Sequence, residues 1–197
     1  MSVCPISDLD FETILTSIRS KILLSLSEIN GTPEILNFQL ALALQCFTNE
    51  YIYSQTEKEN KALTIIESSI EDIFSNGEKP NETAVLCLAS YKPLHEFEWS
   101  HSLVFPLQIM EVKKRQILEP LEEKFLQSKI PILHEITNNV SHKVRKQYEE
   151  NPYPRWVNLG LYLRPIPISK MIKELNLRLY SHKIMMLDTP QILIAGC

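Results

Sequence analysis

The sequence predicts a mainly α-helical protein, an irregular helical bundle that ends in a single strand. Three observations support this fold class. Only 4 glycines occur in 197 residues, which is few for the turns of a β-rich protein. Most apolar residues recur every three or four positions, as on one face of an amphipathic helix. Near the end of the chain, the apolar residues Ile192 to Ala195 predict a buried strand from Gln191 to Ala195.

The first half of the chain predicts three helices. The first has its apolar face between residues 11 and 29, formed by Phe11, Ile14, Leu15, Ile18, Ile22, Leu26 and Ile29. Thr32 and Pro33 suit the start of a second helix, which includes Glu34 to Tyr53 and is apolar nearly all round, as in the centre of a bundle. A capping box at Thr56-x-x-Glu59 starts the third helix, and Asn76-Gly77 ends it.

The second half predicts shorter and more irregular elements. Residues 92–106 lack a clean period and contain two prolines, so a loop or broken helix is expected there. The helices predicted around this segment are Glu82 to Tyr91, Leu107 to Gln127 with a kink or break at Pro120, Pro131 to Glu150, and Ser169 to Tyr180. No internal period is present, so the chain is not a solenoid.

Composition argues against several functions. The net charge of −4 gives no electrostatic signature for nucleic acid, and the short basic runs at 113–115 and 143–146 are interpreted as solvated helix faces. No apolar run approaches the ~18 residues of a membrane helix, and the N-terminus lacks a basic signal region. The cysteines and histidines show no metal-ligand spacing, and Cys46 and Cys87 suit a core. We expect a cytoplasmic protein without a metal site.

The segment VRKQYEENPYPRW, residues 144–156, is the most unusual local sequence. Pro152 and Pro154 cannot continue a helix, so the preceding helix should end near Glu150 and lead into a stiff segment. Such a segment suits a junction or pocket because it loses little entropy on ordering. The candidate residues are Tyr148, Asn151, Tyr153, Arg155 and Trp156. The alternative is a covering loop whose aromatic residues fill the edge of a core. No catalytic residue is predicted.

Four segments give the chain a resemblance to a known family. They are QCFTNEY at 45–51, YKPLH at 91–95, QYEENPYPRW at 147–156 and ILIAGC at 192–197. In this order they resemble bacterial class I S-adenosylmethionine-dependent methyltransferases that often carry tetratricopeptide repeats. The resemblance implies a helical domain at 1–150, a proline-rich junction and linking helix at 151–187, and the first strand of a Rossmann-like catalytic domain at 188–197.

The same resemblance implies where the cofactor would bind. Gly196 would be the first glycine of the loop that approaches S-adenosylmethionine, and the other glycines and strands of that domain would lie beyond residue 197. We therefore expect the 197-residue chain alone neither to bind the cofactor nor to transfer methyl groups. Its partner would be its own catalytic domain, and the methyl acceptor is not predicted.

Two other hypotheses remain open. The chain could be a stand-alone helical module that recruits another protein through an amphipathic groove. The terminal segment 192–195 argues against this, because an independent adaptor would then expose an apolar strand. The third and weakest hypothesis is that a second polypeptide completes the sheet.

Overall fold

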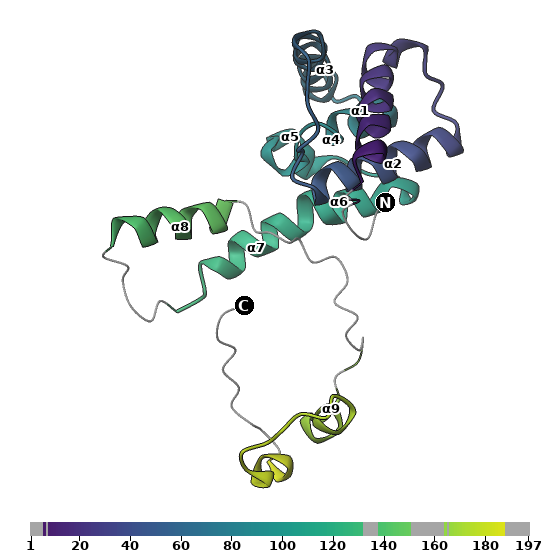
Figure 1. The fold of residues 1–197 in the computed structure, drawn as a ribbon. Helices are drawn as coiled ribbons and strands as arrows, with labels where there is room; N and C mark the ends of the chain where they lie inside the picture. The colour runs from purple at the N-terminus through teal and green to yellow at the C-terminus, as the bar shows by residue number, and fades with distance from the viewer. Residues whose placement is uncertain (1–5, 7, 132–137, 151–163, 165, 188–197) are drawn as a thin grey trace. The chain divides into compact units, whose positions relative to one another are not determined.

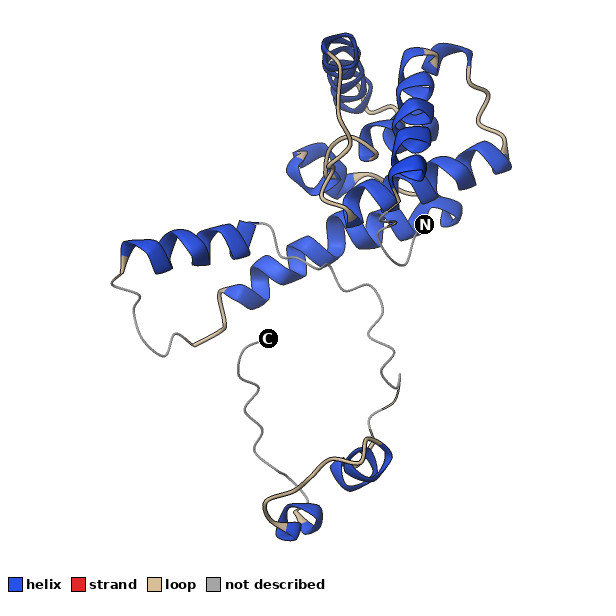
Figure 2. Cartoon of the chain, viewed as in Figure 1, coloured by secondary structure: helices blue, strands red, loops and turns tan. Residues whose placement is uncertain are grey.

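The computed structural model of the chain describes residues 6, 8–131, 138–150, 164 and 166–187 (Figure 1). All regular elements within these residues are helices, and no strand occurs among them (Figure 2). The prediction of a helical protein is therefore confirmed for the described residues, whereas the predicted strand at 191–195 lies outside them. None of the described helices is long and apolar enough to cross a bilayer.

The chain divides into two units, residues 1–157 and 158–197, and each is described separately. The first unit contains α1 Leu9–Leu24, η1 Leu26–Glu28, α2 Pro33–Thr48, α3 Glu57–Ser75, α4 Glu82–Ala89, η2 Leu94–Glu96, α5 Glu98–Ser102, η3 Leu107–Ile109, α6 Met110–Lys113, η4 Lys114–Leu118, α7 Glu119–Gln127 and α8 Asn139–Glu150. The second unit contains α9 Ile168–Glu174 and η5 His182–Met186.

Helix α1 differs from its predicted length and face. The Asp8 carboxylate accepts hydrogen bonds from two backbone N–H groups of the first turn, and the helix ends at Leu24 instead of continuing to Ile29. The predicted face is wrong at its beginning, where Phe11 and Ile14 are each 52% exposed. The side of the helix that faces the core carries Leu15, Arg19 and Leu23, because a buried carbonyl accepts a hydrogen bond from the Arg19 side chain.

Helix α2 is the central helix that the sequence predicts. Thr32 and Pro33 start it as expected, and its last seven residues, 42–48, are all buried. The predicted continuation to Tyr53 is wrong, because Glu50 and Tyr51 adopt left-handed backbone angles of φ 58° and 55°. The Tyr51 N–H donates to the Cys46 carbonyl at 2.8 Å, which closes the end of the helix. Helix α2 packs against α4 (Figure 1).

The predicted ends of α3 are confirmed. Thr56 and Glu59 form the capping box, in which the Glu59 carboxylate accepts from the Thr56 N–H at 2.8 Å. At the other end, Gly77 has φ 77° and the Glu78 N–H donates to the Ile73 carbonyl, as in a Schellman cap. Helix α4, predicted to reach Tyr91, ends at Ala89.

Residues 92–106 form a broken helix, consisting of η2 and α5. The segment is more deeply packed than a solvated loop, because its large apolar side chains enter the main core; these are Leu94, Trp99, Leu103 and Phe105. Beside Trp99, Glu98 and His101 are exposed, whereas Ser100 is buried and its hydroxyl donates to the Leu94 carbonyl at 2.7 Å.

The stretch from Leu107 to Gln127 is helical, as predicted, but its geometry changes before Pro120. Residues Lys114–Leu118 form a π-helix, and α7 follows directly. Pro120 has no N–H for the carbonyl of Gln116, and its ring crowds that carbonyl. The wider π turn accommodates both effects, so Pro120 changes the local helix type while the helix continues.

Two predicted helices are shorter in the structure. The helix predicted from Pro131 begins at Asn139, where the Asn138 side-chain oxygen accepts from the N–H groups of Val140 and Ser141. The helix predicted from Ser169 to Tyr180 is α9, which ends at Glu174 because Asn176 turns left-handed at φ 50°. Both boundaries are asparagine caps that the periodicity does not reveal.

Candidate functional site

The structure describes one of the predicted junction residues. Tyr148 lies on α8 and is 65% exposed. Asn151, Tyr153, Arg155 and Trp156 lie outside the described residues, as does Gly196. The polar groups that the structure does bring together lie elsewhere, in the core of the first unit.

Arg19 is the centre of a buried polar cluster. Its side chain is fully buried, and its two terminal nitrogens donate to three backbone carbonyls, those of Ser90 at 3.3 Å, Tyr53 at 3.1 Å and Ser54 at 2.9 Å. The guanidinium also lies 4.1 Å from the centre of the Tyr91 ring. Arg19 therefore connects α1 to the end of α4 and to the loop that follows α2.

Tyr91 extends this cluster to the start of α3. Its hydroxyl donates to the Glu59 carboxylate at 2.7 Å, and Thr56 donates to the same carboxylate through its N–H and its hydroxyl. Burial alone would raise the pKa of Glu59, but these hydrogen bonds outweigh burial and hold that pKa below its ordinary value. Burial and then the bond to Glu59 raise the pKa of Tyr91, so its phenol remains protonated as the donor.

Gln116 is the centre of a second buried polar cluster. It is fully buried within the π-helix η4, and its amide nitrogen donates to the carbonyls of Ala43 at 3.1 Å and Ala89 at 3.0 Å. Its amide oxygen accepts from the Leu94 N–H at 3.3 Å. One side chain thus satisfies backbone groups of α2, α4 and η2.

The two clusters bring together two of the segments that carry the family resemblance. Within residues 45–51, Cys46 and Phe47 are buried and the Tyr51 hydroxyl donates to the Ala89 carbonyl at 3.3 Å. Within residues 91–95, Tyr91 contacts Arg19 and Leu94 bonds Gln116. The segments lie in two adjacent core clusters, with Cys46 in one and Tyr91 and Leu94 in the other, and their described contacts hold helices together.

Among the described residues, the two buried thiols and the metal-ligand side chains form no reactive or metal-binding centre. Burial raises the pKa of the Cys46 thiol to about 11 and that of Cys87 to about 12, so neither is a thiolate at neutral pH. No group of three His, Cys, Asp or Glu side chains in this part of the chain is placed to hold a metal ion. The buried clusters are suited to joining helices.

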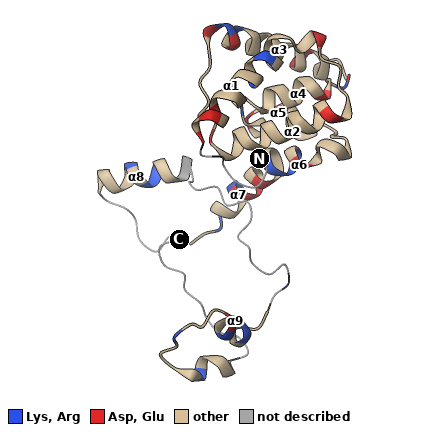
Figure 3. Ribbon diagram, turned by 45° about the vertical axis from the view of Figure 1, so that its right-hand side comes forward, with Lys and Arg blue, Asp and Glu red and all other residues tan. Residues whose placement is uncertain are grey.

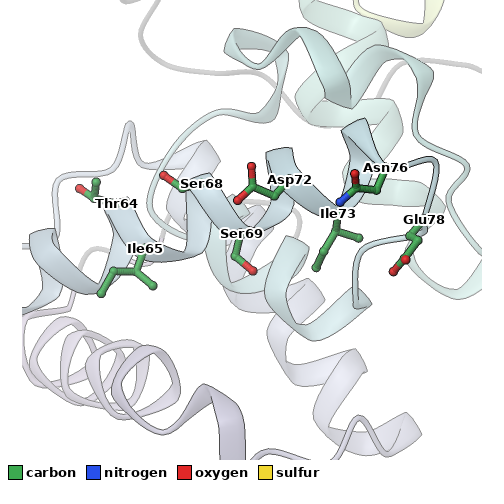
Figure 4. A pocket seen from close by; sticks show the side chains of 8 residues that line it. All are labelled: Thr64, Ile65, Ser68, Ser69, Asp72, Ile73, Asn76 and Glu78. Carbon is green, nitrogen blue, oxygen red and sulfur yellow. The ribbon is translucent and has the colours of Figure 1, made fainter.

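The surface of α3 carries two hollows. One, of about 490 Å³, is lined along α3 and just beyond it by mostly polar residues (Figure 4); they are Thr64, Ile65, Ser68, Ser69, Asp72, Ile73, Asn76 and Glu78. The other, of about 600 Å³, lies between α3, the end of α1 and the start of α4 and is mostly apolar. Ile65, Ser69 and Ile73 line both, so the hollows adjoin each other.

Comparison of the chain with protein-family models, curated proteins and solved structures found no match.

The Glu59 carboxylate predicts a pH dependence of stability. Because its pKa is lower in the folded chain than in the unfolded chain, its contribution is complete above the unfolded value and is lost as pH falls through the folded value. Glu59→Gln should therefore lower the free energy of unfolding by about 1–3 kcal/mol at neutral pH, and by less below about pH 4. Urea unfolding at both pH values measures this difference.

The matched control is Glu57→Gln, an exposed carboxylate in the first turn of the same helix. Its effect should be within about 0.5 kcal/mol at either pH. A Glu59→Gln effect that stays constant between neutral and acidic pH would show that the buried charge is not what stabilises the fold.

Proposed function

We propose that this chain contains the non-catalytic helical domain of an S-adenosylmethionine-dependent methyltransferase. In this proposal residues 1–150 form the helical domain, and residues 151–187 connect it to a catalytic domain that begins near residue 188. The cofactor site belongs to that second domain, with Gly196 in its first glycine loop. The partner of the helical domain is the catalytic domain of the same protein.

The observation that carries the proposal is that the segments at 45–51 and 91–95 lie in two adjacent core clusters, which Arg19 connects through Tyr53 and Tyr91. Arg19 and Gln116 bind backbone carbonyls that lie in or next to these segments. If these segments determine how a helical domain folds, the members of a family can share them although the segments take no part in catalysis. The high thiol pKa values of Cys46 and Cys87 agree with a domain whose role is structural in this sense.

A helical interaction module is the second candidate function. It is favoured by the apolar hollow of about 600 Å³ beside α3, whose rim includes Leu24 and the strongly exposed Ile65. An apolar hollow on a helical surface suits an amphipathic segment of another protein. Only the methyltransferase candidate requires the native protein to bind S-adenosylmethionine.

The test is ultraviolet cross-linking of the native protein, purified from its source cells, with S-adenosylmethionine labelled in its methyl group. The proposal predicts label that unlabelled S-adenosylmethionine competes away and that an equal concentration of ATP leaves unchanged. A native protein that takes up no label would overturn the methyltransferase proposal and favour the interaction module. The isolated 197-residue chain serves as the control and should remain unlabelled.

A further inference from the structure

Helix α7 has an apolar face that is largely uncovered. Leu118 at the end of η4, Leu121 and Phe125 are spaced three and four residues apart, and Leu126 adjoins Phe125; they are 48%, 36%, 57% and 49% exposed. The Lys129 ammonium group lies over the Phe125 ring, with its nitrogen 3.8 Å from the ring centre. Apolar residues grouped in this way on a helix usually mark a contact surface.

Helix α8 has a matching stripe. Val140, Val144 and Tyr148 occur at every fourth residue and are 69%, 45% and 65% exposed. The rest of the helix is polar or charged. An amphipathic helix of this length has little stability of its own, so it needs a surface on which to bury its stripe.

The two stripes have the same length, and the charged residues beside them are mainly of opposite sign. Each extends over nine residues, from 118 to 126 and from 140 to 148, which is roughly 12 Å of helix. Glu122 and Glu123 accompany the stripe of α7, together with one basic residue, Lys124, while Glu119 is already paired with Arg115 at 2.9 Å. Basic residues accompany the stripe of α8, namely Lys143, Arg145 and Lys146 (Figure 3). The 11 residues between the helices can extend over up to ~36 Å, which is enough for α8 to return along α7.

We infer that α8 packs antiparallel along the apolar face of α7. In this arrangement Val140 lies near Phe125, Val144 near Leu121 and Tyr148 near Leu118. The occupant is the chain's own α8 because a short connection gives it an effective concentration of roughly millimolar, which a second copy of the chain reaches only at very high protein concentration.

The pairing has a consequence for residues 151–156. An antiparallel α8 ends beside the start of α7, close to η4, where Gln116 is anchored in the core. The C-terminal end of α8 would then lie beside the helical body. Its use as a junction to a catalytic domain rests on the proposed function, whereas the pairing of α7 with α8 does not.

The first test compares two variants by hydrogen–deuterium exchange. Val144→Glu places a charge on the stripe, while His142→Glu places the same charge on the opposite side of α8 and is the matched control. In the wild type, the amides of α7 should be protected, and Val144→Glu should speed their exchange about tenfold. His142→Glu should leave it unchanged. Equal exchange in α7 for the wild type and both variants would overturn the inference.

The second test identifies the occupant and does not depend on methyl transfer. Leu121→Cys and Val144→Cys are combined in a chain that also carries Cys4→Ser and Cys197→Ser, so that the remaining cysteines, Cys46 and Cys87, are buried. Oxidation should give a disulfide within one chain at every protein concentration. Disulfide-linked dimers alone would assign the face to the α8 of a second copy, and no disulfide would exclude the pairing. Loss of pairing with retained labelling by S-adenosylmethionine would leave the proposed function standing.

Discussion

Replacing Arg19 by methionine should lower the free energy of unfolding by about 3–5 kcal/mol, the largest effect expected of any single substitution in the first unit. Methionine fills a similar volume but cannot donate a hydrogen bond. The carbonyls of Tyr53 and Ser90 would then lose their donor in the core, and the carbonyl of the exposed Ser54 would lose it at the edge of the core. Tyr91 would also lose the cation that lies over its ring.

The measurement is urea unfolding followed by circular dichroism, with Lys21→Met as the control. Lys21 is an exposed cation on the same helix, so its replacement removes the same charge without touching the core. Its effect should stay within about 0.5 kcal/mol. Arg19→Lys should fall between the two, because an ammonium group lacks the fork that reaches three carbonyls. Equal stabilities of Arg19→Met and Lys21→Met would contradict the role given to Arg19.

Replacing Gln116 by leucine should cost about 2–4 kcal/mol. Leucine keeps much of the volume, but the carbonyls of Ala43 and Ala89 and the N–H of Leu94 would remain buried without this partner. Most of the cost arises from the Leu94 N–H, which loses its acceptor, whereas the Ala89 carbonyl still accepts from the Tyr51 hydroxyl. An unsatisfied buried polar group is more expensive than a lost hydrogen bond in water.

Two readouts separate this mechanism from a general packing defect. Amide exchange at Leu94 should speed up in Gln116→Leu, because its acceptor is gone. Gln108→Leu is the control, since Gln108 is exposed and its loss leaves the core intact. A Gln116→Leu chain as stable as Gln108→Leu would mean that the π-helix does not depend on this side chain.

Local signals allowed several helix ends to be predicted from the sequence. Thr32 with Pro33, Thr56 with Glu59, and Gly77 act through neighbouring backbone groups, so a short stretch of sequence contains all the required information. The central position of α2 was also predictable, because a helix that is apolar on every side has to be covered.

The features that the sequence did not reveal depend on contacts between residues that are far apart in the chain. Arg19 looks like a surface residue in the periodicity of α1, and only the distant carbonyls of Tyr53 and Ser90 make its burial favourable. The π-helix had a visible signal, because Pro120 has no N–H for the carbonyl of Gln116, four residues earlier. Its bonds to α2 and α4 could not be predicted, since they connect residues far apart in the chain.

The candidate site predicted from the sequence also differs from what the structure describes. The predicted junction depends on residues 151–156, which lie outside the described part of the chain. Among the predicted junction residues, the structure describes only Tyr148, on α8. The described part instead reveals two polar clusters that join helices. In the proposed function, the helical domain provides structure and another part of the protein provides the chemistry.

The most direct measurement maps where S-adenosylmethionine labels the native protein. After cross-linking, limited proteolysis and mass spectrometry would locate the labelled peptide. We predict label in peptides from residue 188 onward, and an unlabelled helical fragment that contains residues 9–127. Label on a peptide within residues 9–127 would contradict the assignment of a purely structural role to the helical domain.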